Sequence, residues 1–396
     1  MPILDPAQFA AGHWQCDFAF GRCRPTDDPA TVAFLHALSR AILAESGARR
    51  FPDLMTLGYF CRKSNMARAL AQRPDIAQCT GWGTVLHIAP SNIPINFGFS
   101  LVMGLAAGNS NIVRVPSRLF EQMTLFVALF DRVAQASEFS TFTSQTAFVQ
   151  TNRDDPALDG LVARADGLVV WGGDATVARF RALPKMPRCV EVYFPDRVSA
   201  ALLDAPTIAA AAPDALETLA NQFFNDTFLV DQNACSSPGL VFWRGSEDQM
   251  KAAQAVFWPA VAQRLQGNYS LDPVARLDRA LDVMRMARAK GHPVTLHAND
   301  AAIWRLEGAE LRDQLLRFGT FLEVTVPDIA ACAPYLRPNE QTLTVFGPEP
   351  GDVFAALKGT AARLDRIVPV GRALDIGLNW DGRDMLTTLS RRVELG

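Results

Sequence analysis

The sequence lacks the features that would mark the chain as a metal-binding, membrane or secreted protein. Its seven cysteines form no C-x-x-C pair and its five histidines form no H-E-x-x-H group, so we expect no metal site. The first residues show no basic start followed by an unbroken apolar stretch, which predicts a cytoplasmic protein. No apolar run reaches the about 20 residues that a bilayer crossing requires, so no membrane insertion is expected.

The sequence also has no large excess of charge of either sign. The 38 basic and 41 acidic residues are scattered and give a formal net charge of -3, so no basic stripe is available to bind nucleic acid. A small-molecule substrate is therefore favoured. The first expected strand is not followed by the dinucleotide motif G-x-G-x-x-G, and no P-loop occurs. With 396 residues and 49% hydrophobic content, the chain can form more than one core, which predicts two lobes.

What the chain does contain is an alternation of helical and strand patterns. In residues 1–80, apolar residues recur at helical spacing, in 31–45 and 53–70, and predict a helical region that packs on a cofactor lobe. Beyond residue 81, βαβ units predict an α/β fold with a parallel, Rossmann-like sheet. The expected strands are 84–89, 111–115, 146–150 and 167–171, and the expected helices are 95–107, 120–134, 157–165 and 175–183.

The second half of the chain predicts a catalytic lobe. A helix expected at 207–224 leads into a polar turn and an apolar strand at 240–243, and 246–291 is expected to be helical. A closing helix at 352–364 and strand at 366–370 are expected to return to the first lobe. The predicted division is therefore a helical region at 1–80, a cofactor domain at 81–205 completed by 351–396, and a catalytic domain at 206–350.

A turn bounded by prolines follows the first expected strand, in the sequence Pro-Ser-Asn-Ile-Pro from Pro90 to Pro94. The prolines restrict the turn, so the Asn92 amide is aimed rather than free to rotate. A rigid amide beyond a strand end suits an oxyanion hole, where one donor is worth about 2.7–4 kcal/mol of barrier. The alternative is that Asn92 only caps the next helix, as asparagine often does.

Two further strand ends predict a nucleotide site. Arg114 ends the second expected strand, and neutral Ser117 and basic Arg118 follow it, with no carboxylate nearby to bind a ribose 2′-hydroxyl. Guanidinium groups bind a 2′-phosphate well, so NADPH is preferred and NADH is the alternative. After the strand at 167–171, Gly172 and Gly173 open a helix whose N–H groups could hold a pyrophosphate. The alternatives without a cofactor role are that Arg114 is a solvated charge and that Asp174 is an ordinary N-cap.

The candidate nucleophile is Cys235, in the polar turn Asn-Ala-Cys-Ser-Ser-Pro-Gly between a long helix and a strand. A thiolate attacks a thioester far better than a hydroxyl does, and local N–H donors lower a thiol pKa from about 8.5. The neighbouring serines lack a G-x-S-x-G elbow, which disfavours a serine hydrolase. The alternative is that Cys235, like most unpaired cysteines, is a small core residue.

Taken in this order, four segments resemble the LuxC-type acyl-CoA reductases. These segments are the Pro-Ser-Asn-Ile-Pro turn, Gly-Asn-Ser-Asn-Ile-Val-Arg-Val-Pro-Ser, Trp-Gly-Gly-Asp and Asp-Gln-Asn-Ala-Cys-Ser-Ser-Pro, and a Trp-Asp-Gly near the C-terminus adds to them. The family comprises the fatty acid reductases linked to bacterial luminescence and is a branch of the aldehyde dehydrogenase superfamily. The resemblance implies an aldehyde dehydrogenase-like fold, with a Rossmann-like cofactor lobe, an α/β catalytic lobe and the active site in the cleft between them.

The resemblance also implies roles for single residues. Cys235 would take the acyl group from CoA, and Asn92 with the Cys235 N–H would hold the tetrahedral oxyanion. Arg114 would bind the adenosine ribose or its phosphate, with Ser91, Ser117 and Arg118 as further cofactor residues. Gly172 and Gly173 would meet the pyrophosphate, and hydride transfer would then release the aldehyde.

One departure from the superfamily pattern favours reduction over oxidation. Relatives that oxidise aldehydes carry a glutamate that activates water, and the comparable position here is Tyr193, with Glu191 two residues away. Without that base the thioester survives long enough to be reduced. Glu323 is expected to be a strand residue facing solvent, with the superfamily's ribose-binding glutamate as the alternative. His87, between apolar neighbours, is expected to be a hydrogen-bonded core histidine.

We therefore expect NADPH-dependent reduction of an acyl-CoA, with a long-chain fatty acyl group, to the aldehyde through a cysteine thioester. Two alternatives stay open: a dehydrogenase that oxidises an aldehyde with Glu191 as base, and an acyl-carrying subunit that docks to an acyl-activating synthetase. The expected partners are the acyl-CoA substrate and such a synthetase. The sequence leaves open the length of the acyl chain, the metabolic pathway and whether the protein forms a homo-oligomer.

Overall fold

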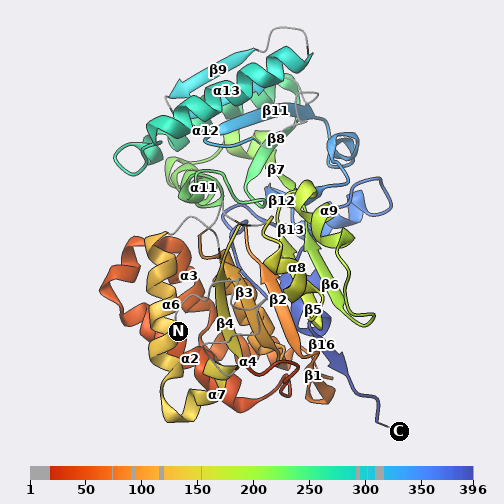
Figure 1. The fold of residues 1–396 in the computed structure, drawn as a ribbon. Coiled ribbons are helices and arrows are strands. Elements are labelled where there is room, and N and C mark those ends of the chain that lie inside the picture. Colours follow the sequence, from red (N-terminus) through yellow and green to blue (C-terminus); the bar gives the residue numbers. More distant parts are fainter. Residues whose placement is uncertain are drawn as a thin grey trace. The chain divides into compact units, whose positions relative to one another are not determined.

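The computed structural model describes residues 18–73, 75–90, 94–115, 120–152, 154–290, 295–300, 302–307 and 316–395. The chain divides into two compact units (Figure 1). Unit 1 comprises Met1–Asp196 and Ile376–Gly396, and unit 2 comprises Arg197–Asp375. Unit 1 therefore contains the predicted cofactor residues, and unit 2 contains Cys235.

Unit 1 is built on a five-stranded parallel sheet of order β4-β3-β2-β5-β6. Its strands are short and apolar, and four of the five are almost wholly buried, as is typical of a parallel sheet covered on both faces. They are β2 (Thr84–Ile88), β3 (Ser110–Val115), β4 (Thr146–Gln150), β5 (Gly167–Trp171) and β6 (Val190–Phe194).

Helices cover both faces of this sheet. One face packs on α8 (Ala157–Val162) and α9 (Asp174–Ala182) through residues such as Leu158 and Phe180. The other face packs on the helices that connect the strands and on the N-terminal helices. These are α2 (Pro29–Ala44), α3 (Pro52–Phe60), α4 (Lys63–Ala71), α5 (Asn96–Ala106), α6 (Glu121–Ala134) and α7 (Ser140–Ser144).

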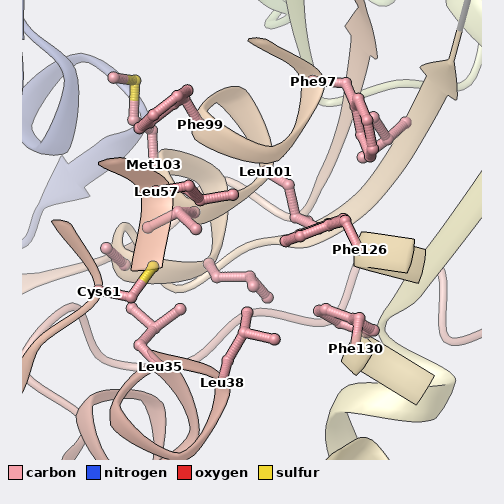
Figure 2. Close-up of a cluster of buried hydrophobic side chains, with 14 of the residues drawn as sticks. Leu35, Leu38, Leu57, Cys61, Phe97, Phe99, Leu101, Met103, Phe126 and Phe130 are labelled. Atoms are coloured by element: carbon pink, nitrogen blue, oxygen red, sulfur yellow. The ribbon is translucent and has the colours of Figure 1, made fainter. Parts of the chain in front are cut away.

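Figure 2 shows how the N-terminal helices join the core of unit 1. Leu35 and Leu38 of α2 and Leu57 of α3 lie beside the phenylalanines of α5 and α6, and all are buried. Phe97 and Phe126 meet edge to face, with ring centroids 5.3 Å apart, which is a favoured aromatic geometry. The C-terminal strand β16 (Ser390–Arg392) pairs with β1 (Cys79–Gly81) and thereby returns to this unit. The elements β14 (Asn379–Trp380), β15 (Arg383–Asp384) and α15 (Met385–Thr388) precede β16 in the chain and belong to the same unit.

Unit 2 is built on a seven-stranded sheet of order β13-β12-β7-β8-β11-β10-β9, parallel except for the edge strand β9. One face packs on α10, α11 and α12, and the other on α13 and α14. The strands are β7 (Val198–Asp204), β8 (Pro238–Arg244), β9 (Leu296–Asp300), β10 (Ile303–Glu307), β11 (Thr320–Val326), β12 (Glu340–Phe346) and β13 (Arg366–Pro369). The helices are α10 (Ala205–Ala209), α11 (Pro213–Asp226), α12 (Glu247–Leu265), α13 (Pro273–Lys290) and α14 (Pro350–Leu357).

Three expectations need correction. The strand expected to return to the first lobe, β13, pairs instead with β12 of unit 2, and β7 also belongs to that sheet, so the boundaries fall at Asp196 and Asp375 rather than at residues 205 and 350. The expected helix at 207–224 is two helices, because Pro213 cannot donate a helical hydrogen bond and starts α11. The expected helix at 53–70 likewise breaks after Phe60 into α3 and α4.

Candidate active site

Cys235 lies in a β-turn three residues before β8, at the edge of the unit 2 sheet where its parallel strands begin. The Ser237 N–H donates to the Ala234 carbonyl at 3.0 Å, so Cys235 and Ser236 are the two central residues of this turn. Both central residues are half-buried. The parallel strands β7 and β11, which flank β8, begin at this same edge, so the turn lies beside their first residues.

The side chain of Gln232 fixes the segment before this turn. Its Nε2 donates to the carbonyls of Pro238 at 2.8 Å and Thr320 at 3.0 Å, and its Oε1 accepts from the N–H groups of Gly319 at 2.9 Å and Thr320 at 3.1 Å. The side chain is 1% exposed, and Gln232 and its neighbour Asp231 both have positive φ. One amide group therefore connects the cysteine turn to the start of β11.

A second side chain, that of Ser199, holds the cysteine residue itself. The Ser199 hydroxyl accepts from the Thr342 N–H at 3.1 Å and donates to the Cys235 carbonyl at 2.7 Å. The register of β7 shifts against both neighbouring strands at this level. The hydroxyl thus supplies hydrogen bonds where the register shift interrupts main-chain pairing. The sequence pattern alone does not predict this role.

Three of the other five cysteines in the described chain, Cys61, Cys189 and Cys332, have thiols whose pKa is raised by burial. Cys61 and Cys332 are buried in the two cores, and burial raises the pKa of the Cys332 thiol to about 12. Cys189 is half-buried beside Glu191, and burial followed by that carboxylate raises its thiol pKa to about 11. These thiols stay protonated at neutral pH, which makes them poor nucleophiles.

In unit 1, the strands that precede the predicted cofactor residues lie where the order of the strands reverses. β2 lies between β3, which follows it in the chain, and β5, which starts the other half of the sheet. In open α/β sheets, ligands bind outside the carboxyl ends of the strands at such a switch point. The neighbouring strands β2 and β5 both end on this side of the sheet, and Gly172 directly follows β5. A dinucleotide therefore fits this edge on topological grounds.

Four of the predicted site residues, Ser91, Asn92, Ser117 and Arg118, lie outside the described residues. Their roles stay predictions. In the sequence, Ser91 and Asn92 come shortly after the end of β2, and Ser117 and Arg118 come shortly after the end of β3.

Gly172 and Gly173 form the turn between β5 and α9, as predicted for a Rossmann-like unit. A Cβ on Gly173 would lie 2.9 Å from the Asp196 carboxylate, so a larger residue here would require the Asp196 side chain to move. The Asp174 N–H donates to Asp196 at 3.0 Å, so this helical donor already has an anionic partner. Asp174 is the first residue of α9, and the cap position is Gly173, which corrects the alternative that Asp174 is the N-cap.

Arg114 is a buried residue whose guanidinium binds main-chain carbonyls. Its Nε and Nη2 donate to the Thr151 carbonyl at 2.9 and 2.7 Å, and Nη1 donates to the Ala89 carbonyl at 3.2 Å. The side chain therefore links the residues that follow β2 and β4. It is buried, so the alternative interpretation of Arg114 as a solvated charge is wrong. Its direct contact with a ribose stays a prediction.

The expectation for His87 is confirmed. The ring is fully buried, with Nδ1 2.7 Å from the Ser100 hydroxyl and Nε2 3.0 Å from Asn111 Oδ1. The Trp171 indole N–H also reaches Ser100, at 3.0 Å. Burial lowers the pKa of His87 to about 4, so the neutral imidazole is a weak base, and both of its ring nitrogens already have hydrogen-bond partners.

Glu191 and Tyr193, on strand β6 of unit 1, form a hydrogen-bonded pair. The Tyr193 hydroxyl donates to Glu191, and the Lys185 ammonium lies 3.3 Å from the same carboxylate. Burial and the Glu191 carboxylate raise the pKa of Tyr193, so the phenol stays protonated as the donor. Glu191 thus already has two partners on its own unit.

The expectation that Glu323 faces solvent is wrong. Its side chain is only 6% exposed, and Oε1 accepts from the indole N–H groups of Trp243 and Trp258, both at 2.9 Å. The Arg305 guanidinium lies 3.2 Å from Oε2. Glu323 is therefore the polar centre of the aromatic core beneath α12.

Two absences apply to the described ranges only. Within them, no three His, Cys, Asp or Glu side chains gather closely enough to hold a metal ion. No helix of the same ranges combines the length and apolar content that crossing a membrane requires.

The two units together have the α/β fold of the aldehyde dehydrogenases. The NAD-dependent benzaldehyde dehydrogenase of Corynebacterium glutamicum matches with a TM-score of 0.64 and 11% identity, over 92% of this chain and 85% of that one. A 1-pyrroline-5-carboxylate dehydrogenase from Thermus with bound NAD has the same TM-score at 13% identity, over 93% and 81%. A variant of proline utilization A from Bradyrhizobium japonicum matches with a TM-score of 0.63 and 16% identity, over 93% of this chain. This chain spans 41% of that protein's length.

The chain belongs to the LuxC family of acyl-CoA reductases. The family's model, described as Acyl-CoA reductase (LuxC), matches residues 60–392. No curated protein matches the chain significantly. The predicted family and fold are therefore confirmed, and the family supports an activity on acyl or aldehyde groups.

Proposed function

We propose that the protein reduces an acyl-CoA to the aldehyde and that Cys235 carries the acyl group as a thioester. The observation that carries this proposal is the cysteine turn itself. Of the six cysteines in the described chain, Cys235 is the one in a tightly braced turn at the edge of a parallel sheet. A nucleophile needs a fixed position and access to its substrate, and a half-buried, hydrogen-bonded turn supplies both.

In the first step the Cys235 thiolate attacks the carbonyl carbon of the acyl-CoA. A carbon–sulfur bond to Cys235 forms, and the bond to the CoA sulfur breaks, so CoA leaves as a thiolate that takes up a proton. A bound nicotinamide would supply hydride to the acyl carbon, which releases the aldehyde and returns the thiol after protonation. Asn92 would donate to the oxyanion that develops during the attack.

The cofactor proposal rests on the strand ends of unit 1. Six residues would hold a nicotinamide dinucleotide there: Ser91, Arg114, Ser117, Arg118, Gly172 and Gly173. Arginine and serine near the ribose favour the 2′-phosphate of NADPH over the diol of NADH. The bound NAD in the Thermus relative supports a nicotinamide cofactor in this fold.

Reduction is favoured over hydrolysis of the thioester by the state of Glu191. A water-activating base must be free to accept a proton, and this carboxylate already accepts from Tyr193 and lies beside Lys185. A long-chain acyl group and docking to an acyl-activating synthetase are proposed from the family resemblance.

The experiment is a steady-state assay of NADPH oxidation with tetradecanoyl-CoA, with aldehyde measured as the product. We expect turnover by the wild type and a loss of at least about 10³-fold in Cys235→Ala. Cys189→Ala, which removes a half-buried thiol of unit 1, is the matched control and should retain activity. NADPH should be preferred to NADH, and Arg118→Ser should reduce that preference about tenfold or more.

Other outcomes identify the alternatives. Formation of free acid from aldehyde and NADP⁺ without CoA would assign an oxidising dehydrogenase. Acylation of Cys235 only by a synthetase, with no turnover of free acyl-CoA, would assign an acyl-carrying subunit. Equal NADPH oxidation by the wild type and Cys235→Ala would remove the thioester from the proposal.

A further inference from the structure

The β-turn at Cys235 leaves two polar groups that its own hydrogen bond does not use. The bond from Ser237 N–H to the Ala234 carbonyl closes the turn, so the central peptide group, between Cys235 and Ser236, makes no bond within it. Neither central residue has positive φ, which excludes the turn types that need a left-handed residue. The Cys235 carbonyl and the Ser236 N–H are therefore available to groups outside the turn.

The Cys235 carbonyl has a fixed partner. Ser199 accepts from the Thr342 N–H, so its own hydroxyl hydrogen is directed to the Cys235 carbonyl at 2.7 Å. Ser199 is 2% exposed, and it sits where the register of β7 shifts against β8. The carbonyl is thus held toward the interior edge of the sheet.

Fixing this carbonyl also fixes the direction of the Ser236 N–H. In a planar trans peptide the C=O and the following N–H point in opposite directions. Since the carbonyl points to Ser199, the N–H points to the opposite side of the turn. No partner of the Ser236 N–H occurs among the residues that the structure describes.

A neighbouring group supports the same interpretation. The Ser237 hydroxyl is 4% exposed and has no hydrogen-bond partner in the described part of the chain, although buried polar groups are nearly always paired. The turn therefore holds an unpaired main-chain N–H and an unpaired buried hydroxyl within two residues of the candidate nucleophile.

We propose that the Ser236 N–H is a further oxyanion donor for the carbonyl oxygen of the acyl group, beside the Asn92 amide and the Cys235 N–H that the family resemblance implies, and that Ser199 is the positioning residue that directs it. This inference rests on the proposed function, because it assigns a donor to the thioester carbonyl that Cys235 attacks. The donor acts while the carbon–sulfur bond to Cys235 forms and negative charge moves onto the carbonyl oxygen. A main-chain N–H directly after a nucleophile has this role in hydrolases with a nucleophile elbow.

The test separates positioning of the thiol from stabilisation of the oxyanion. Iodoacetamide alkylates a thiolate by displacement of iodide and develops no oxyanion, whereas acyl transfer from dodecanoyl-CoA does. We expect Ser199→Ala to slow single-turnover acylation of Cys235 by about 10–100-fold, since a small misplacement of a catalytic group has an effect of this size. Alkylation of Cys235 in the same variant should keep its rate and its pH profile.

Two controls accompany Ser199→Ala. Ser199→Thr retains the hydroxyl and should restore most of the acylation rate. Thr227→Ala removes another buried hydroxyl of unit 2, which donates to the Phe223 carbonyl at 2.6 Å, and should acylate like the wild type. If Ser199→Ala does not fold, Ser236→Pro, which lacks the N–H, is compared with Ser236→Ala, which keeps it. Because proline also restricts the Cys235 backbone, each acylation rate is divided by the alkylation rate of the same variant, and this ratio should be at least about 100-fold lower in Ser236→Pro.

The outcomes are distinct. Equal losses of acylation and alkylation in Ser199→Ala would show that Ser199 orients only the thiol and would overturn the oxyanion assignment. Unchanged acylation in Ser199→Ala, or equal ratios of acylation to alkylation in the two Ser236 variants, would overturn the inference while leaving the proposed function intact. A wild type that alkylates at Cys235 but never acylates would instead refute the proposed function.

Discussion

The strongest quantitative prediction concerns Gln232, whose side-chain amide makes four hydrogen bonds in a fully buried site. Replacing it with alanine leaves the N–H groups of Gly319 and Thr320 and the carbonyls of Pro238 and Thr320 without this partner. Each net hydrogen bond is worth about 0.5–1.5 kcal/mol, so we expect the loss of all four in Gln232→Ala to lower the free energy of unfolding by roughly 2–6 kcal/mol.

The backbone at this position provides a matched comparison. Gln232 has φ of 55°, a left-handed conformation that is unfavourable for a residue with a Cβ by about 1–2 kcal/mol. Gln232→Gly removes the same four hydrogen bonds but relieves this strain. It should therefore be more stable than Gln232→Ala by about 1 kcal/mol, in contrast to the usual order of these residues.

Urea unfolding followed by tryptophan fluorescence measures both effects, since Trp243 and Trp258 lie in the core of unit 2. Alkylation of Cys235 by iodoacetamide should change in rate in both variants, because the turn loses its connection to β11. A loss of less than about 1 kcal/mol in Gln232→Ala, or a glycine variant less stable than the alanine variant, would refute this reasoning.

Three more predictions follow from buried polar or tightly packed residues. Burial raises the pKa of Asp226 to about 7, against the lowering effect of the Gly371 and Ala373 N–H groups, so its ionisation destabilises the fold as pH rises from about 4 through 7. The free energy of unfolding should therefore fall by about 2 kcal/mol more between pH 5 and 8 in the wild type than in Asp226→Asn, as urea titrations at both pH values would show. Glu323→Ala removes the acceptor of two indole N–H groups and should cost about 3–5 kcal/mol in thermal or urea unfolding; Glu323→Gln, which keeps one oxygen, should cost less. Gly104→Ala would place a Cβ 2.0 Å from Asn111 Oδ1, so we expect a destabilisation of about 1–3 kcal/mol, and unchanged stability would show that α5 can shift freely.

The unit 1 sheet could be predicted closely because its strands are local patterns. β4 and β5 have the expected bounds, since each is a short apolar run between residues that end strands. The ends of α5 and α6 were expected to within one residue. Pairing between strands was harder: β13 has the expected sequence position, but only the structure shows that it pairs with β12.

Sequence reasoning could propose candidate site residues where the chemistry is carried by one residue type, but not where a role depends on contacts between residues far apart in the chain. Cys235 could be singled out because its polar neighbours in the chain argue against an apolar core, where unpaired cysteines commonly lie. Ser199 could not, because it is 36 residues away and its role comes from strand register. Glu323 was misjudged for the same reason, since its partners Trp258 and Trp243 lie 65 and 80 residues away.

The most direct test of the account is to trap the acylated protein. Wild-type protein incubated with tetradecanoyl-CoA in the absence of NADPH should gain the mass of one acyl group, located by peptide mapping on Cys235. Addition of NADPH should remove that mass and release an equal amount of aldehyde. An acyl group on another cysteine, or a Cys235 thioester that NADPH leaves unchanged, would contradict the account.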